Sequence, residues 1–172
     1  EPFKGMFRFG RVEIKEGIRW IGQKAFYGTG MKSITFPSTL TDIYKDAFRD
    51  CKDLTYVTLP SGLRKIGSGA FYGCQSLTNV SFNSRLQEIG FSAYAFTAGA
   101  LENITIPGSV ISIDKGAFYN NASLKKVIIQ DGVKQLNTRA FGACENLESI
   151  VIPESVSSFG DYIFGYSIPR AL

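Results

Sequence analysis

The side chains that most often carry catalysis or bind metal are scarce in this chain of 172 residues. It contains no histidine, the commonest general base at neutral pH and the commonest metal ligand. Histidine-dependent triads and zinc hydrolases are therefore excluded. The remaining chemistry is a pair of carboxylates, but Asp42, Asp46, Asp50 and Asp53 indicate a solvated, turn-rich segment rather than two groups across a cleft. We expect no enzyme activity and no cofactor.

Three cysteines raise the question of a metal site or a disulfide. Zinc needs four ligands, and no histidine or nearby cysteine pair supplies them. Cys51, Cys74 and Cys144 all occupy one position of the repeat described below, which Met6 and Asn121 also fill. We therefore predict small, buried packing residues with reduced thiols. The alternative is a Cys51–Cys74 disulfide, because stacking of consecutive units brings the Cα atoms to about 5 Å.

The composition is that of an ordinary folded protein, with 44% hydrophobic and 20% charged residues. No stretch approaches the roughly 18–20 apolar residues of a membrane span, so we expect no membrane insertion. Lys and Arg number 19 against 15 Asp and Glu, a net charge of +4. A nucleic-acid binder concentrates basic residues on one stripe. Here only Arg64–Lys65 and Lys125–Lys126 are adjacent, so we expect no nucleic-acid partner.

A repeat runs through the whole chain. Its most regular feature is a phenylalanine at positions 3, 26, 48, 71, 96, 118, 141 and 164, preceded by alanine in all but the first and last copies. Successive copies lie 22 to 25 residues apart. The unit is L-x-x-V-x-I-P-x-x-V-x-x-I-x-x-x-A-F-x-x-C-x-x. Self-similarity at a fixed period of this length is the signature of a repeat architecture.

The V-x-I segment of each unit predicts a short strand, because alternating apolar residues place one face inward and the other outward. Proline after four of these segments ends the strand, since it cannot donate to a ladder. One unit cannot bury its own apolar face, but stacked copies form a continuous parallel sheet with strands about 4.8 Å apart. The rings from Phe26 to Phe141 should then stack inside.

We therefore predict one solenoid domain over residues 1–172, with about seven and a half turns of about 23 residues and both ends open. The expected class is an α/β-type repeat solenoid, a right-handed coil with one parallel β-sheet. Most residues should lie in strands, loops or 3-10 turns, with little regular helix. Because solenoid ends normally carry capping repeats, we expect this chain to be part of a longer array.

The columns of the repeat resemble a known family. The run from Leu147 to Phe159, with Ala140-Phe141-Gly142-Ala143-Cys144 before it, is similar to the BspA-like leucine-rich repeat, also called the Treponema pallidum type. The similarity covers nearly the whole chain. It implies a leucine-rich-repeat solenoid, a cell-surface or secreted location in host-associated bacteria or some parasitic protists, and, for some members, adhesion to host matrix or cells. The family supplies no catalytic residue.

Function in a repeat protein should lie where the columns vary. The outward positions of the predicted strands line the concave face, and their Thr, Ser and Asn indicate that this face meets water, unlike a parallel sheet covered by helices. One interpretation is a shallow polar surface for an extracellular protein or glycan; the other is residues chosen for β-propensity alone. The candidate partner-binding residues on this face are Tyr56, Thr58, Asn79, Ser81, Asn103, Thr105 and Lys126.

Two irregular places add further candidates. The segment from Ile89 to Phe96 is two residues longer than its equivalents, and insertions in solenoids form loops on one face. Its Phe91 and Tyr94 either anchor a partner or fold back over the next unit. Trp20 stands in a column that is otherwise polar, so it is either an exposed contact or covered by a preceding repeat.

These observations favour a non-catalytic, macromolecule-binding module of a cell-surface or secreted protein, acting in adhesion or host interaction. The alternative is a structural spacer that presents another domain. We expect a monomer, or weak self-association through the open ends. Asn79, Asn103 and Asn121 begin N-glycosylation sequons, and glycans on the first two would block the concave face.

Overall fold

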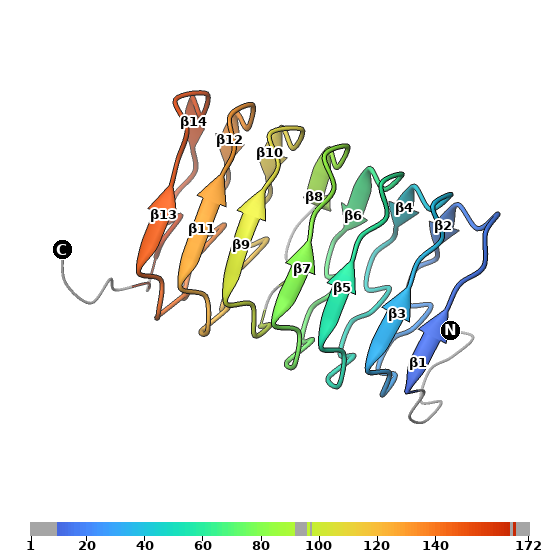
Figure 1. Cartoon of the computed structure of the whole chain (residues 1–172). Coiled ribbons are helices and arrows are strands. Elements are labelled where there is room, and N and C mark those ends of the chain that lie inside the picture. Colours follow the sequence, from blue (N-terminus) through green and yellow to red (C-terminus); the bar gives the residue numbers. More distant parts are fainter. Residues whose placement is uncertain (1–9, 92–95, 97, 166, 168–172) are drawn as a thin grey trace.

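Each repeat contributes two short parallel strands, which stack into two layers (Figure 1). The computed structural model describes residues 10–91, 96, 98–165 and 167. Within these residues there is neither an α-helix nor a 3-10 helix, and turns join the strands. The expected 3-10 segments and the α/β designation are therefore wrong for the described part of the chain. The array is a parallel β-solenoid, in agreement with the prediction of stacked turns.

The first layer is the one predicted from the V-x-I segments. Its strands begin at residues 11, 33, 56, 79, 103, 126 and 149, a spacing of 22 to 24 residues. In each strand the middle apolar residue points inward, and Val57, for example, is 1% exposed. The strands are β1 (Arg11–Glu13), β3 (Ser33–Thr35), β5 (Tyr56–Thr58), β7 (Asn79–Ser81), β9 (Asn103–Ile106), β11 (Lys126–Ile129) and β13 (Ser149–Val151).

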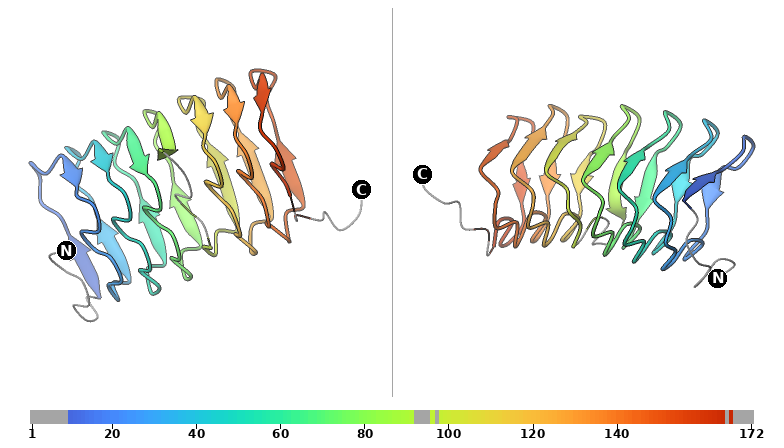
Figure 2. Two further views of the ribbon diagram at one scale, coloured as in Figure 1. Left: turned by 180° about the vertical axis from the view of Figure 1, so that it is seen from behind. Right: turned by 60° about the horizontal axis from the view of Figure 1, so that its bottom comes forward.

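The prediction of a single sheet is wrong, because the second apolar pair of each unit also forms strands. They build one parallel, seven-stranded sheet that runs without interruption along the back of the array (Figure 2). Most contain only two residues, too few to be stable alone, and they persist because seven copies pair side by side. The strands are β2 (Trp20–Ile21), β4 (Asp42–Ile43), β6 (Lys65–Gly67), β8 (Glu88–Phe91), β10 (Ser112–Ile113), β12 (Gln135–Leu136) and β14 (Ser158–Phe159).

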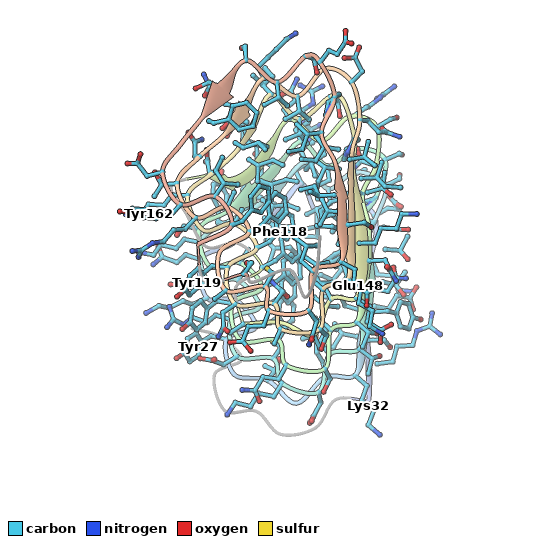
Figure 3. The ribbon with its side chains drawn as sticks, turned by 90° about the vertical axis from the view of Figure 1, so that its left-hand side faces the viewer. Tyr27, Lys32, Phe118, Tyr119, Glu148 and Tyr162 are labelled. Atoms are coloured by element: carbon cyan, nitrogen blue, oxygen red, sulfur yellow. The ribbon has the colours of Figure 1, made fainter. Side chains whose placement is uncertain are left out.

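The predicted column of phenylalanines is confirmed as the centre of the core, and Figure 3 shows Phe118 between the strand layers and the turns. Adjacent rings from Phe26 to Phe141 are stacked, with centroids 4.9 to 5.5 Å apart and interplanar angles of 3° to 11°. Phe48, Phe96, Phe118 and Phe141 are at most 1% exposed. Each buried ring contributes about 2–3 kcal/mol of hydrophobic free energy, so the column stabilises one turn on the next.

The first layer, unlike the second, is broken in the middle. It consists of a four-stranded sheet, β1-β3-β5-β7, and a three-stranded sheet, β9-β11-β13; among the described residues no pairing joins β7 to β9. The break lies in the turn that carries the two extra residues. In the second layer the same turn is continuous but irregular, because the register shifts so that Gly67 lies opposite Phe91.

A candidate binding face on the first strand layer

Most of the predicted partner-binding residues share one exposed surface, which we call the outer face: the outward side chains of the first-layer strands. Tyr56 is 54% exposed, and it lies directly opposite Asn79 in the β5–β7 ladder, as Thr58 lies opposite Ser81. Asn103 and Thr105 extend outward from β9 and Lys126 from β11, where Asn103 lies opposite Lys126. The structure therefore groups these seven residues, and their role in binding stays a prediction.

The two groups of outer-face residues meet at a shallow groove where the sheet is broken. The groove has a volume of about 480 Å³, spans the break between β7 and β9, and extends to β11. Its polar lining includes Asn79, Ser81, Asn103, Thr105, Lys126 and Gln130, and its apolar lining includes Phe82, Pro107 and Ile128. The sequence predicts that these residues point outward, and the structure shows that they line one hollow.

Backbone geometry explains why the groove stays open. Next to the break, Glu102 N–H reaches Thr78 C=O at 3.4 Å, whereas the corresponding bond one turn on, Lys125 N–H to Glu102 C=O, is 2.8 Å. Leu59 N–H donates to Ser81 C=O at 3.3 Å across β5 and β7. Phe82 N–H, one turn later, has no such bond to the next strand within the part of the chain that the structure describes.

Phe82 lies at this break in a column that holds Leu59 and Ile106 in the neighbouring turns. Its ring meets the stacked column edge-on, 5.6 Å from Phe96 at 87° and 6.4 Å from Phe118 at 89°. Edge-to-face contacts of this kind are favourable for aromatic pairs. The half-buried Phe82 side chain therefore contacts two core rings while lining the floor of the groove.

Of the other three predicted residues, Trp20 and Phe91 belong to strands of the second layer. Trp20 lies on β2 in the second layer, opposite Asp42, and is 60% exposed, so it is an exposed side chain on a different surface. Tyr44, 51% exposed, follows in the next turn. Phe91 ends β8, and only its backbone is described. Tyr94 lies outside the described residues.

The cysteine column proves to be a column of hydrogen-bond donors. Cys51, Cys74 and Cys144 are free thiols that are fully buried, so their predicted burial is confirmed. Each Sγ donates to the carbonyl of the phenylalanine one turn earlier, at 3.0, 3.2 and 3.3 Å. Asn121 Nδ2 does the same to Phe96 at 2.8 Å. The column therefore selects a small donor, which explains why asparagine replaces cysteine.

Burial also fixes the protonation state of these thiols. Desolvation raises the pKa of Cys51 and Cys144 to about 11, and that of Cys74 well above its ordinary value. The thiols therefore stay neutral at physiological pH, and metals and disulfide exchange require the thiolate. No cluster of three or more Cys, Asp or Glu suited to a metal occurs among the described residues.

The three sequons differ in how far their asparagines are buried. Asn79 and Asn103 are exposed on the outer face, as predicted. Asn121 is fully buried, and its amide donates to Phe96 and Phe118, so it is inaccessible in the folded chain. No helix in the described residues is long and apolar enough to cross a bilayer.

Sequence analysis missed a stripe of tyrosine and basic side chains on the turns opposite the outer face. Arg49 lies over the ring of Tyr72, 4.3 Å from its centroid, and Arg139 lies 5.9 Å from that of Tyr162. The available signal was a tyrosine directly after Ala-Phe in three turns. Figure 3 shows Tyr27 and Tyr119, together with Tyr162, on the side away from Lys32 and Glu148.

The chain is similar to known repeat proteins along nearly its whole length. Residues 1–97 and 90–169 match the BspA type leucine-rich repeat region, in six copies. A crystal structure of a T. pallidum leucine-rich repeat protein superposes with a TM-score of 0.85 at 34% identity, over 95% of this chain and 82% of that one. No curated protein matches the sequence.

Two more distant structures share the fold. A leucine-rich repeat protein from Eubacterium ventriosum gives a TM-score of 0.82 at 20% identity, and one from Bacteroides ovatus gives 0.73 at 23%. They cover 96% and 92% of this chain, which spans 45% and 47% of their lengths. Repeat arrays of this kind are binding or structural modules. The 23-residue period, the stacked turns and these matches agree, and the chain belongs to the BspA-type leucine-rich repeat family.

Proposed function

We propose that this chain is a non-catalytic binding module of a cell-surface or secreted protein, and that it acts in adhesion or host interaction through the outer face. The observation that carries the proposal is the groove between β7 and β9, which interrupts the otherwise regular first layer. The surface location and the extracellular partner, a protein or a glycan, follow from what the family resemblance implies.

The asymmetry of the two strand layers favours binding over a spacer role. A spacer needs only regular stacking, and the second layer has it in seven continuous strands. The first layer has no ladder between β7 and β9 among the described residues, and it exposes polar side chains there. Functional sites commonly occur where a scaffold departs from its own regularity, and the break is such a place.

A binding panel tests the proposal. The purified chain is applied to immobilised matrix proteins, mucins and glycans, and saturable binding is measured by biolayer interferometry. A double variant, Tyr56→Ala with Asn79→Ala, should weaken a positive signal at least about tenfold, because exposed aromatic anchors and their neighbours carry much of an interface's energy.

The matched control lies on the second layer. Tyr44 and Gln135 are exposed there and are of the same chemical types, so Tyr44→Ala with Gln135→Ala should leave binding unchanged. If only the control variant lost binding, the interface would lie on the second layer and the proposed outer face would be wrong. A well-folded chain that binds nothing in the panel would instead support the spacer function.

A further inference from the structure

The groove between β7 and β9 carries polar side chains that the protein itself leaves unused. Asn79, Ser81, Asn103 and Thr105 make no side-chain hydrogen bond within the described residues, although all four line the groove. Gln130 accepts a bond from Gly108 N–H at 3.4 Å through Oε1, which leaves its two amide N–H donors. The groove therefore presents several donors and acceptors at the surface of one small hollow.

The charge of the groove has one sign. Lys126 is the one charged side chain among the described residues that line the groove. Lys126 forms no ion pair with any other described residue. An ammonium group without a protein partner, surrounded by neutral amides and hydroxyls, is complementary to a ligand with one negative group per binding unit.

The types of side chain favour a saccharide over a peptide. The cores of protein–protein interfaces are enriched in Tyr, Trp, Met and Arg and depleted of Ser and Lys, whereas six of the twelve residues that line this groove carry an amide or a hydroxyl and none is Tyr, Trp, Met or Arg. The hollow of about 480 Å³ is within the usual range of small-molecule sites. Phe82, Pro107 and Ile128 add an apolar surface against which the C–H face of a sugar ring packs.

We propose that this groove binds a carboxylate-bearing saccharide, with Lys126 Nζ pairing with the carboxylate and Asn79, Asn103 and Gln130 hydrogen-bonding the hydroxyls. This assignment rests on the proposed function, because it takes the outer face as the binding face. It names the class of ligand and the residue that selects it: an acidic sugar should bind and a neutral one of equal length should not.

The test uses two tetrasaccharides of similar size, an acidic one that should bind and a neutral one that should not. Hyaluronan tetrasaccharide carries two glucuronate groups, and chitotetraose is neutral. Each is titrated into the isotopically labelled 172-residue chain, and amide shifts are followed by NMR. We expect saturable shifts in residues 79–82 and 103–107 with hyaluronan, and affinity at least about tenfold weaker for chitotetraose.

Charge variants separate the groove from general attraction to a basic protein. Lys126→Gln should weaken hyaluronan binding about tenfold, as expected for loss of a charge-assisted hydrogen bond. Lys125→Gln is the matched control: it removes the same charge one residue away, at an exposed position that does not line the groove. Equal losses in the two variants would overturn the proposal, and so would binding of both sugars with equal affinity.

The remaining outcomes distinguish this inference from the proposed function. If matrix proteins bind the outer face and neither sugar does, the binding module stands and the saccharide assignment is wrong. The assignment is equally wrong if tetraglutamate binds at residues 79–82 and 103–107 while hyaluronan does not, because the ligand is then an acidic peptide. If no protein, sugar or peptide binds, both proposals fail.

Discussion

A single side-chain position links most described turns of this solenoid to the one before it. The residue three positions after a stacked phenylalanine donates to the carbonyl of the preceding phenylalanine, through sulfur at Cys74 and Cys144, an amide at Asn121 and a hydroxyl at Ser167. Gly99, in the turn with the two extra residues, has no side chain that could donate. Different chemistries meet the same need, which is to satisfy a buried carbonyl. A sequence shows such a column as a mixture of small residues, and only the structure shows what they share.

Asn121 is the strongest member of this column, because it donates to Phe96 and Phe118 at 2.8 and 2.9 Å. Replacing it with leucine removes both donors and should lower the free energy of unfolding by about 2–3 kcal/mol. Urea denaturation of Asn121→Leu measures this loss. The control is Asn103→Leu, which is exposed and should change stability by less than about 0.5 kcal/mol. Similar losses in both would show that the buried bonds contribute little.

The buried thiols give the protein a dependence on alkaline pH. The pKa of Cys51 and Cys144 is about 11 in the folded chain, against an ordinary value of 9.0, because burial disfavours the thiolate. The neutral thiol is thus favoured in the folded state. The stability contribution is complete below pH 9 and is lost as the pH rises from 9 towards 11, by up to about 1.4 kcal/mol per pH unit for each thiol.

Serine substitution tests this, because serine keeps a donor but does not ionise in this range. The double variant Cys51→Ser with Cys144→Ser should lose less stability than the original chain between pH 8 and pH 10.5, measured as the shift in urea midpoint. The two proteins are otherwise identical, so the difference between their shifts isolates the two substituted thiols. Identical shifts in the two proteins would contradict a role for the thiols.

One backbone position per turn also shows how far sequence reasoning reaches at the residue scale. The position two residues after the phenylalanine has positive φ, between 55° and 70°, in Gly28, Asp50, Gly73, Asn120 and Ala143. Glycine and asparagine favour this left-handed conformation, so the sequence contained part of the signal. Alanine does not favour it, and at Ala143 the stacked array imposes the conformation.

At the scale of the strands, periodicity predicts one layer and misses the other. The V-x-I segments alternate and were recognised as strands, whereas the following V-x-x-I pairs do not alternate and span too few residues. The missed strands form through pairing between turns rather than through local preference. Likewise, the inserted segment was visible as a difference in length, but a sequence gives no sign that β7 and β9 will fail to pair.

Hydrogen exchange tests directly whether β7 and β9 fail to pair. Phe82 N–H and Leu59 N–H occupy equivalent positions after β7 and β5, but only Leu59 donates to the next strand within the described chain. Phe82 should therefore exchange at least about tenfold faster, after correction for intrinsic rates, because its amide needs no opening of a ladder. Equal protection of the two amides would mean that the ladder closes in solution and that the groove does not persist.

At the scale of the whole molecule, the break between β7 and β9 divides an array whose stability is the sum of contributions from each turn and from each interface between adjacent turns. In a solenoid each turn contacts only adjacent turns, so stability is transmitted from interface to interface. Between β7 and β9 the second layer and the ring stack continue, through β8 and the contact of Phe71 with Phe96, 4.9 Å apart. The first layer contributes no ladder there, which makes this interface the weakest connection between two blocks.

Two matched core variants test whether the blocks open separately. Leu54 and Leu124 occupy the same column on opposite sides of the break, and both are fully buried. Leu54→Ala should lower exchange protection by about 2–5 kcal/mol in β3, β5 and β7, and much less in β9 and β11. Leu124→Ala should show the reverse. If either variant lowers protection equally along the chain, the array unfolds as one unit and the break is only a feature of the surface. If each variant instead loses protection mainly in its own block, the groove lies at the boundary between two blocks that open separately. A ligand that contacts both β7 and β9 then stabilises the interface between these blocks.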